Sequence, residues 1–466
     1  MKIQPAEKVP RKVNPRARRE VRKHLKLLDP GPRTAVGDQK DEMDVKAHSS
    51  PPRKIVIATY GSRGDVQPLL ALALALRKRG HHVSLAGPPE YAEWVESYGC
   101  AYRPFGTNFK DFARTFPEIH TVRAAVMMVN FLRRETKLHF RQLPEVIKGA
   151  DMVLGASLTF GLATVAESIN IPHRFITFCP QLLRSAHHPP IVVPNHNLPR
   201  IANRLLWRLA HWFDVFNGRA IINRERKCLG LKTIDDFWDY FMGDPVIVAS
   251  DPLLGTPPDD VKQRWFQPGY FHLAQNGGFG DELEAFLESG PPPVYIGFGS
   301  MPSASPEDLT RLLRDTVEAS SNRFIIAKGW TNLYFPVRSK NVFVLESAPH
   351  DHLFPRTAAV VHHGGSGTTA TAARAGTPQI IVPHALDQFY WANRVRSLGL
   401  GPDPVPRVRL TAGRLRKAIA ECVGSVAMRR NARDLAANLA GCDSLGNGVR
   451  MIESELSNRD RAVRSG

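Results

Sequence analysis

The stretch His362-His363-Gly364-Gly365-Ser366-Gly367-Thr368-Thr369 decides how this part of the chain folds. It lies between the apolar run Ala358–Val361, typical of a buried strand, and the small residues Thr369–Arg374, typical of a packed helix. Glycines and small hydroxyl residues at such a turn let backbone N–H groups approach an anion closely, and the helix dipole favours negative charge there. A histidine in the same turn can donate a hydrogen bond to a phosphate oxygen. We therefore predict a diphosphate site formed by His363, Gly365, Ser366, Gly367 and Thr368.

A carboxylate and an amide follow at the end of the next predicted strand, in Pro383-His384-Ala385-Leu386-Asp387-Gln388-Phe389. Side-chain oxygens of this kind accept hydrogen bonds from hydroxyl groups, so Asp387 and Gln388 suit a sugar. The alternative for the whole region is a glycine-rich turn between strand and helix that binds nothing. The Asp–Gln pair argues against that alternative.

Two runs of alternating strands and helices indicate the fold class. Lys54–Thr59 and Val83–Ala86 have the composition of buried strands and flank a predicted helix, Val66–Lys78, which is a βαβ unit. After three prolines at 291–293 the alternation restarts with the predicted strand Val294–Phe298. We predict an α/β protein with two Rossmann-like, doubly wound parallel-sheet domains. The predicted segments are a basic tail without fixed structure (1–52), an N-terminal domain (53–251), a linker region (252–292), a C-terminal domain (293–445) and a last helix and tail (446–466).

Composition narrows the class of protein. The chain has 466 residues, of which 43% are hydrophobic and 23% charged, ordinary values for a globular protein. The longest apolar run, Leu69–Leu76, has eight residues, far from the ~18 of a membrane-spanning helix. The basic N-terminus lacks the apolar stretch of a secretory signal. Five scattered cysteines without a C-x-x-C pair predict reduced thiols in a cytoplasmic protein, with neither a disulfide framework nor a zinc site.

The net charge of +18 is the unusual feature of the composition. Residues 1–26 carry ten Lys and Arg against two Glu, a net charge of +8. One interpretation is a solvated extension. The other is electrostatic attraction to anionic lipid, which would place the protein peripherally at the inner face of a membrane. Nucleic acid is not expected as a partner, because the tail has no aromatic residues to stack on bases.

Three motifs in order carry a family resemblance. The segment from Ser347-Ala348-Pro349-His350 to Asp387-Gln388 resembles the donor-binding signature of GT-B nucleotide-diphosphate-sugar glycosyltransferases (glycosyltransferase family 1). Its histidine–glycine turn resembles the branch with sterol glucosyltransferases and glycopeptide glycosyltransferases. Gly61–Pro68 looks like the N-terminal signature of that branch, and Pro293–Met301 looks like the first strand and turn of its C-terminal domain. The resemblance covers residues 53–455.

The resemblance implies that the two domains face each other across a cleft and that the last helix returns to the N-terminal domain. It places Ser300 beside His363 on the diphosphate, whereas His362 has a core position as its alternative. It assigns Ala348 and His350 to a backbone clamp around the pyrimidine, with Trp330 as a stacking partner. Thr371 stands where many uridine-specific members have a glutamate, so UDP is expected as the nucleotide and dTDP stays open. No metal and no cofactor are expected, the nucleotide sugar being a co-substrate.

Asp65 is the predicted catalytic base, accompanied in the first loop by Ser62, Arg63 and Gly64. In this branch an aspartate stands where many members have a histidine. A carboxyl group with an ordinary pKa of ~3.9 is a weak base, and burial between domains would raise its pKa. The alternative role for Asp65 is to cap the helix that follows.

A predicted amphipathic helix, Asn203–Ile221, stands apart from the motifs. One face carries Leu205, Leu209, Trp212, Phe213, Phe216 and Ala220, and the other carries Arg204, Arg208 and Arg219. Core packing is the favoured interpretation of the apolar face. A wall of an acceptor pocket and a contact with a membrane surface are the alternatives.

Together these features predict an inverting glycosyltransferase. The expected reaction moves a hexose, with glucose as the first candidate, from a UDP-sugar to a hydroxyl group of an apolar acceptor such as a sterol or lipid. A monomer is expected. Two alternatives stay open: a natural-product glycosyltransferase that uses UDP- or dTDP-sugar for a polyketide, peptide or flavonoid, and a catalytically silent protein that binds nucleotide sugars.

Overall fold

The computed structural model describes residues 51–115, 122–213, 218–275, 277–299, 306–329, 335 and 339–465. The basic segment 1–26, Ser300 and Trp330 lie outside these ranges. Their roles therefore stay predictions.

A seven-stranded parallel sheet forms the first domain, in the order β3-β2-β1-β4-β5-β6-β7. The seventh strand comes from the segment 252–292, so part of the predicted linker belongs to this sheet. The strands are β1 (Lys54–Tyr60), β2 (His82–Gly87), β3 (Ala101–Pro104), β4 (Met152–Ser157), β5 (His173–Thr177), β6 (Val246–Val248) and β7 (Trp265–Phe266). The helices are α2 (Arg63–Lys78), α3 (Ala92–Ser97), α4 (Phe109–Thr115), α5 (Val122–Val146), α6 (Leu162–Ser168), α7 (Arg200–Phe213), α8 (Gly218–Cys228) and α9 (Phe237–Met242).

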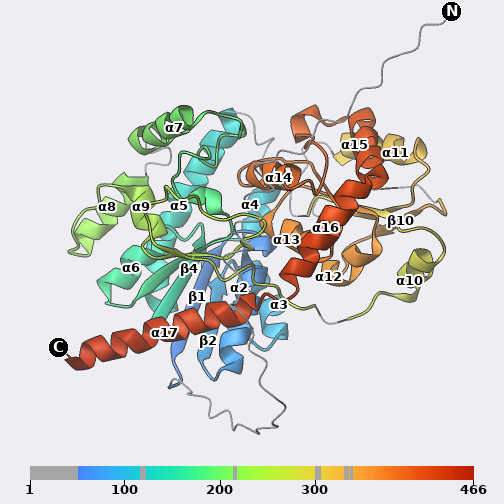
Figure 1. The fold of residues 1–466 in the computed structure, drawn as a ribbon. Helices are drawn as coiled ribbons and strands as arrows, with labels where there is room; N and C mark the ends of the chain where they lie inside the picture. The colour runs from blue at the N-terminus through green and yellow to red at the C-terminus, as the bar shows by residue number, and fades with distance from the viewer. Residues whose placement is uncertain are drawn as a thin grey trace, which may run out of the picture.

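A five-stranded parallel sheet forms the second domain, in the order β10-β9-β8-β11-β12. Helices surround each sheet, which confirms the predicted α/β class with two doubly wound domains (Figure 1). The strands are β8 (Val294–Gly297), β9 (Phe324–Ala327), β10 (Val342–Leu345), β11 (Ala359–His362) and β12 (Gln379–Ile381). The helices are α10 (Asp281–Glu288), α11 (Pro306–Glu318), α12 (His350–Leu353), α13 (Ser366–Arg374), α14 (Gln388–Ser397), α15 (Ala412–Gly424), α16 (Val426–Leu439) and α17 (Ser444–Ser465).

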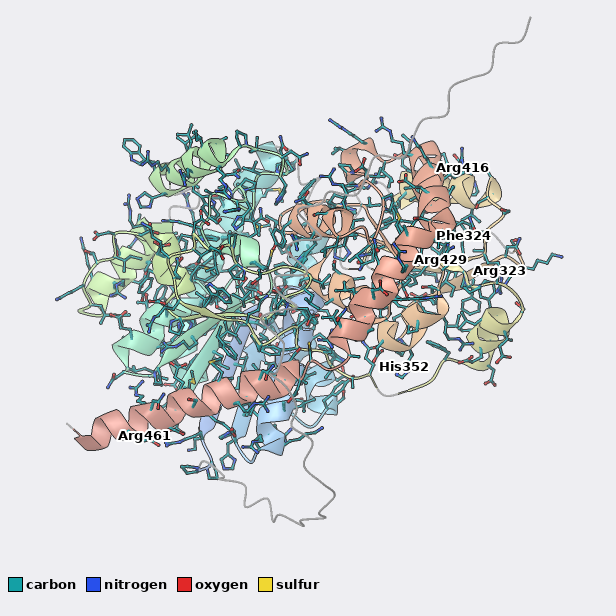
Figure 2. All side chains as sticks on the ribbon, viewed as in Figure 1. Arg323, Phe324, His352, Arg416, Arg429 and Arg461 are labelled. Carbon is teal, nitrogen blue, oxygen red and sulfur yellow. The ribbon has the colours of Figure 1, made fainter. Side chains whose placement is uncertain are left out.

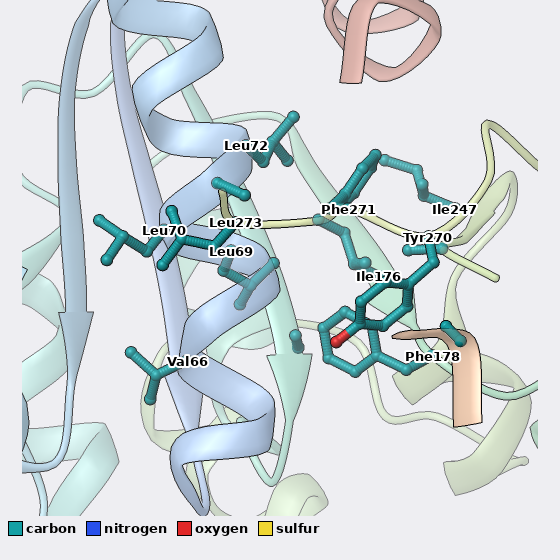
Figure 3. Close-up of a cluster of buried hydrophobic side chains, with 14 of the residues drawn as sticks. Val66, Leu69, Leu70, Leu72, Ile176, Phe178, Ile247, Tyr270, Phe271 and Leu273 are labelled. Atoms are coloured by element: carbon teal, nitrogen blue, oxygen red, sulfur yellow. The ribbon is translucent and has the colours of Figure 1, made fainter. Parts of the chain in front are cut away.

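One of the four apolar clusters formed by the described residues spans both domains. Strands buried on both faces need continuous apolar runs, and in β1 every residue after Lys54 is buried. Figure 3 shows apolar side chains of α2 near Tyr270 and Phe271, which belong to the segment between the domains. Ala370 and Ala373 of α13 belong to the same cluster. The helices that begin at the two predicted motifs are thus held against each other.

A buried ion pair also joins the domains. Arg374 at the end of α13 donates through Nη2 to Asp251 Oδ1 (2.8 Å) and to Ser444 Oγ (3.1 Å). The Asp251 side chain is fully buried, and the same oxygen accepts a hydrogen bond from the Tyr270 backbone N–H. A buried carboxylate is stable only with such partners, so this pair fixes where the linker meets α13.

The last helix runs along the N-terminal domain beside α2, at the lower edge of the view in Figure 1. Glu453 accepts hydrogen bonds from Arg79 at 3.0 and 3.1 Å, and Arg174 pairs with Glu455. Figure 2 shows Arg461 towards the end of this helix and Arg416 on the opposite domain. No helix in the part of the chain that the structure describes has the length and apolar character needed to cross a membrane.

The predicted helix Asn203–Ile221 corresponds to α7 and α8, which flank residues 214–217, outside the described ranges. The core interpretation of its apolar face is wrong for Leu205, Leu209 and Trp212, because all three are exposed. The buried side of α7 is instead formed around Asn203 and Trp207. Their side chains donate hydrogen bonds to the carbonyl groups of residues 186 and 188, at 2.9 and 3.1 Å.

Candidate active site

Both sheets bring their predicted functional residues to the point where the strand order reverses. In the first sheet Asp65 follows β1, and the neighbouring strand β4 ends at Ser157. In the second sheet Gly299 follows β8, and His363 follows the neighbouring strand β11. In doubly wound sheets ligands bind at this position, outside the carboxyl ends of the strands. The fold therefore assembles two facing half-sites.

Asp65 is both a helix-capping residue and a candidate base. Ser62 is the N-cap of α2, and Asp65 completes the capping box: its Oδ2 accepts from Ser62 N (2.7 Å) and Ser62 Oγ (3.0 Å). The other oxygen, Oδ1, accepts a hydrogen bond from Ser157 Oγ at 2.6 Å. Burial raises the pKa of Asp65, while the hydrogen bonds from Ser157 and Ser62 act in the opposite direction. Capping and proton acceptance are thus compatible, because they use different oxygens.

Ser157 is a site residue that the sequence analysis missed. Its φ of 55° lies in the left-handed region, which a residue other than glycine rarely adopts. This backbone conformation places the hydroxyl group on Asp65, which is 92 positions away in sequence. Ser157 is the last residue of β4, and no sequence motif surrounds it.

The ring of His363 fits between two glycines. A Cβ atom on Gly299 would come within 3.2 Å of His363 Cε1, and one on Gly365 within 2.5 Å of Nε2. Burial, followed by the charge of His350, lowers the pKa of His363 to about 4. The imidazole is therefore neutral near pH 7 and offers one N–H donor. Its Nδ1 atom is buried without a hydrogen-bond partner among the residues described.

The first turn of α13 completes the anion-binding arrangement. Gly365 is the N-cap, and no side chain caps the helix. The N–H groups at the start of a helix have no partner within it, so those of Ser366, Gly367 and Thr368 can bind an anion. Tyr270 lies against this turn, since a Cβ atom on Gly367 would come 2.6 Å from its hydroxyl oxygen.

His362 has the core position given as its alternative. It is fully buried, its Nε2 lies 3.0 Å from Gln379 Oε1, and its Nδ1 accepts from Gly364 N at 3.1 Å. These bonds connect the glycine turn to Gln379, the first residue of β12. His362 therefore shapes the turn, whereas His363 lines it.

Asp387 and Gln388 begin α14, but they differ in what they can offer a ligand. The Oε1 atom of Gln388 accepts from the backbone N–H groups of residues 384 and 385, at 2.7 and 3.1 Å, which occupies its two lone pairs. Asp387 is only partly buried by the side chains around it. Burial, and then the charge of Asp65, raises the pKa of Asp387 to about 7. The electrostatic effect of Asp65 places the two carboxyl groups near each other across the domain boundary.

The predicted nucleotide clamp lies at the start of α12. The ring of His350 stacks on Phe354 at 4.5 Å between centroids, and its Nε2 lies 3.0 Å from the hydroxyl of Tyr295. Its side chain is thus engaged within the C-terminal domain, and the backbone from Ala348 onward is the part left for a ligand. Burial, and then the charge of Arg63, lowers the pKa of His350 to about 4. Arg63 comes from the first loop, which therefore faces the clamp.

A largely buried aromatic cluster, also missed from sequence, packs around the end of β1 in the N-terminal domain. Tyr60, the last residue of β1, has its ring 5.9 Å from Phe105 and Phe109, and Phe112 stacks on Phe131 at 3.6 Å. The Tyr60 hydroxyl donates to buried Glu135 at 2.9 Å. These rings come from distant segments, so only the fold brings them together.

The structure was searched for side chains that could bind a metal ion. Across the described ranges, no three His, Cys, Asp or Glu side chains gather where they could hold a metal ion.

Comparisons with known proteins agree with this arrangement. A family model described as the glycosyltransferase family 28 N-terminal domain matches residues 55–187, and the erythromycin biosynthesis protein CIII-like C-terminal domain matches residues 336–444. The vancomycin aglycone glucosyltransferase of Amycolatopsis orientalis is 34% identical over 364 residues, which are 76% of this chain and 87% of that protein. Sterol 3-beta-glucosyltransferase UGT80B1 of Arabidopsis thaliana is 33% identical over 398 residues, 80% of this chain and 63% of that protein.

Solved structures share the two-domain architecture. CalG4, the calicheamicin glycosyltransferase, superposes with a TM-score of 0.67 at 18% identity, over 88% of this chain and 99% of that one. Two doubly wound parallel-sheet domains of this kind are the GT-B architecture. This chain belongs to the glycosyltransferase family that includes the glycopeptide glycosyltransferases and the sterol 3-beta-glucosyltransferases. The resemblance drawn from the motifs is confirmed.

Proposed function

We propose that this glycosyltransferase moves glucose from UDP-glucose, with inversion, to a hydroxyl group of an apolar acceptor such as a sterol or lipid. The observation that carries the proposal is the position of Asp65. Its carboxyl group is electrostatically coupled to Asp387 on the donor side, and it follows β1, which ends at Tyr60 in the buried aromatic cluster. A base beside a sugar site suits transfer to an alcohol, and the sterol 3-beta-glucosyltransferase relatives favour an apolar one.

The proposed reaction is a single displacement. The acceptor hydroxyl attacks the anomeric carbon from the side opposite the diphosphate, and Asp65 takes the hydroxyl proton. The bond between the anomeric carbon and the diphosphate oxygen breaks as the new glycosidic bond forms. The N–H groups of α13 and the neutral imidazole of His363 stabilise the charge that grows on the diphosphate. Because attack and departure occur on opposite faces, an α-linked donor gives a β-glycoside.

Different observations support the proposed donor and the proposed acceptor. Vancomycin aglycone glucosyltransferase and the sterol 3-beta-glucosyltransferases are both named for glucose, which favours this sugar. The resemblance of the segment at Ala348 to a pyrimidine clamp favours a pyrimidine nucleotide. Another relative is named dTDP-epi-vancosaminyltransferase, so dTDP is the second candidate nucleotide. A large natural-product aglycone is the second candidate acceptor, favoured by the vancomycin relative.

An acceptor-dependence assay tests this function. We expect UDP release from UDP-glucose only when sterols or other apolar alcohols are added, with a product heavier by one hexosyl group and β-configured by NMR. dTDP-glucose and glycopeptide aglycones serve as matched alternatives in the same assay. A retained α-configuration would contradict inversion. Release of UDP from none of the mixtures would contradict the proposal as a whole.

We also expect Ser157→Ala to lower turnover about tenfold, the effect of one hydrogen bond to a charged group. That hydrogen bond favours the ionised form of Asp65, so its loss raises the pKa of Asp65. The acidic limb of the kcat/KM profile should therefore move to higher pH. Ser168→Ala, which removes a hydroxyl bonded to a backbone carbonyl in α6, is the matched control. A limb that stays in place would show that Ser157 does not act on Asp65.

A further inference from the structure

Helix α7 presents an apolar stripe to the surface. Ile201, Leu205, Leu209 and Trp212 are spaced along one side of the helix and are 77, 55, 42 and 83% exposed. Surface helices of globular proteins normally turn such a stripe towards the core. We call this stripe, together with Arg200, Arg204 and Arg208 beside it, the α7 outer face.

The orientation of α7 is fixed by its opposite side. Trp207 is buried and donates a hydrogen bond to the backbone carbonyl of His188, and Asn203 is bonded in the same way to Ala186. The ring of His188 in turn lies 6.3 Å from that of Tyr390, in the helix that begins beside Asp387. Helix α7 is therefore anchored near α14, which begins beside Asp387. The hydrogen bonds of Asn203 and Trp207 keep the opposite side of α7, the outer face, exposed.

The arginines of the outer face repeat every four residues along one side of the apolar stripe. Among the described residues, none pairs with Arg204 or Arg208, which line a groove of about 630 Å³ together with Lys262. The nearby carboxylate of Asp236 is occupied by Arg184 at 2.6 and 2.8 Å. The carboxylate of Asp260 accepts from the hydroxyl and N–H groups of residues 185 and 186. Asp239, which lines the same groove, is bonded to Arg184 and Gln263 at 3.5 and 2.8 Å. Arg204 and Arg208 therefore have no carboxylate partner among the described residues.

We propose that the α7 outer face docks the protein on an anionic lipid bilayer. An exposed apolar stripe with tryptophan and flanking arginines is the pattern of a helix that lies in the membrane interface. Arginines also occur on other parts of the protein, such as Arg416 and Arg461 in Figure 2, so positive charge does not distinguish the α7 outer face. The combination of charge with exposed apolar residues points to lipid. An acceptor dissolved in the bilayer would then reach the site beside α7. That last step rests on the proposed function, whereas docking itself does not.

Sedimentation of the full-length protein with vesicles tests the proposal without donor or acceptor. Phosphatidylcholine vesicles are compared with vesicles containing phosphatidylglycerol. Replacing the three arginines (Arg200→Gln, Arg204→Gln, Arg208→Gln) should lower partitioning to anionic vesicles on the order of 100-fold at low salt. Replacing apolar residues (Ile201→Ser, Leu205→Ser, Trp212→Ser) should lower it at least about tenfold at both low and high salt. The control variant Arg416→Gln with Arg461→Gln should bind like the unchanged protein.

Two further measurements separate docking through α7 from binding through the tail and from self-association. A full-length variant with glutamine in place of Lys and Arg in residues 1–26 reports the contribution of the tail. Circular dichroism checks that the α7 variants are folded, and light scattering checks whether they change the oligomeric state. Unchanged vesicle binding in both α7 variants, or no binding by the unchanged protein, would overturn the proposal. A dimer that dissociates on substitution would instead assign the outer face to a second copy of the chain, and would also overturn it.

Discussion

Replacing Asp65 by asparagine is expected to lower turnover by ~10²–10⁴ and to leave UDP-glucose affinity nearly unchanged. Asparagine has the size of aspartate, and its amide oxygen can still accept the hydrogen bond from Ser62 N at the start of α2. It cannot take a proton from an acceptor hydroxyl. The variant therefore removes the chemistry and keeps the local structure. Turnover at saturating acceptor, with donor affinity from calorimetry, measures the two effects separately.

A capping control distinguishes the two roles of Asp65. Ser62→Ala removes the N-cap hydroxyl, so it should cost about 1 kcal/mol in the free energy of unfolding. Its effect on turnover should be far smaller than that of Asp65→Asn, because the carboxyl group stays. If Asp65→Asn kept normal turnover and lost stability as Ser62→Ala does, Asp65 would be a capping residue only.

The backbone of the site could be predicted because it depends on local signals. Apolar runs such as Ala358–Val361 identify buried strands, and the observed strand, Ala359–His362, differs by one residue at each end. The glycines at 364, 365 and 367 mark the turn that follows it. Asp65 lies directly after the first strand, as predicted, but in the first turn of α2 and not in a loop or at the N-cap. The N-cap is Ser62, and Asp65 occupies the third helical position.

Contacts between distant segments could not be read from the sequence. The hydroxyl of Ser157 reaches Asp65 only because β4 lies beside β1 in the sheet. The side-chain oxygen Oε1 of Gln388 turns inward because the backbone N–H groups of residues 384 and 385 need an acceptor. Periodicity shows which residues of α7 share a side. Which side is buried was decided by Trp207 and its hydrogen bond to a distant carbonyl.

We propose that the carboxyl group of Asp387 binds the sugar hydroxyls, so replacing it by alanine should lower kcat/KM for UDP-glucose by ~10²–10³ and change UDP affinity little. Equal losses for UDP and UDP-glucose would contradict that position. The pKa of about 7 adds a pH test. The ionised carboxylate accepts hydrogen bonds more strongly than the protonated form, so the preference for UDP-glucose over UDP should be full above pH 7 and weaken below it. In Asp65→Asn the midpoint should move to lower pH, because the like charge that helps to raise the pKa of Asp387 is gone.

The same shift predicts how Asp387 affects stability. The pKa of Asp387 rises from an ordinary 3.8 to about 7 on folding, so between these values the folded protein binds the proton more tightly than the unfolded chain. Its contribution to stability therefore falls as pH rises from about 4 to 7. We expect Asp387→Asn to raise the Tm at pH 8 and to leave it nearly unchanged at pH 4, measured by calorimetry in parallel with Asp403→Asn, an exposed aspartate of the same domain. A Tm gain of the same size at both pH values would show that the carboxyl group is not held in a site that resists its ionisation. A gain confined to high pH would show that the ionised carboxylate of Asp387 destabilises the fold, as burial and the charge of Asp65 predict.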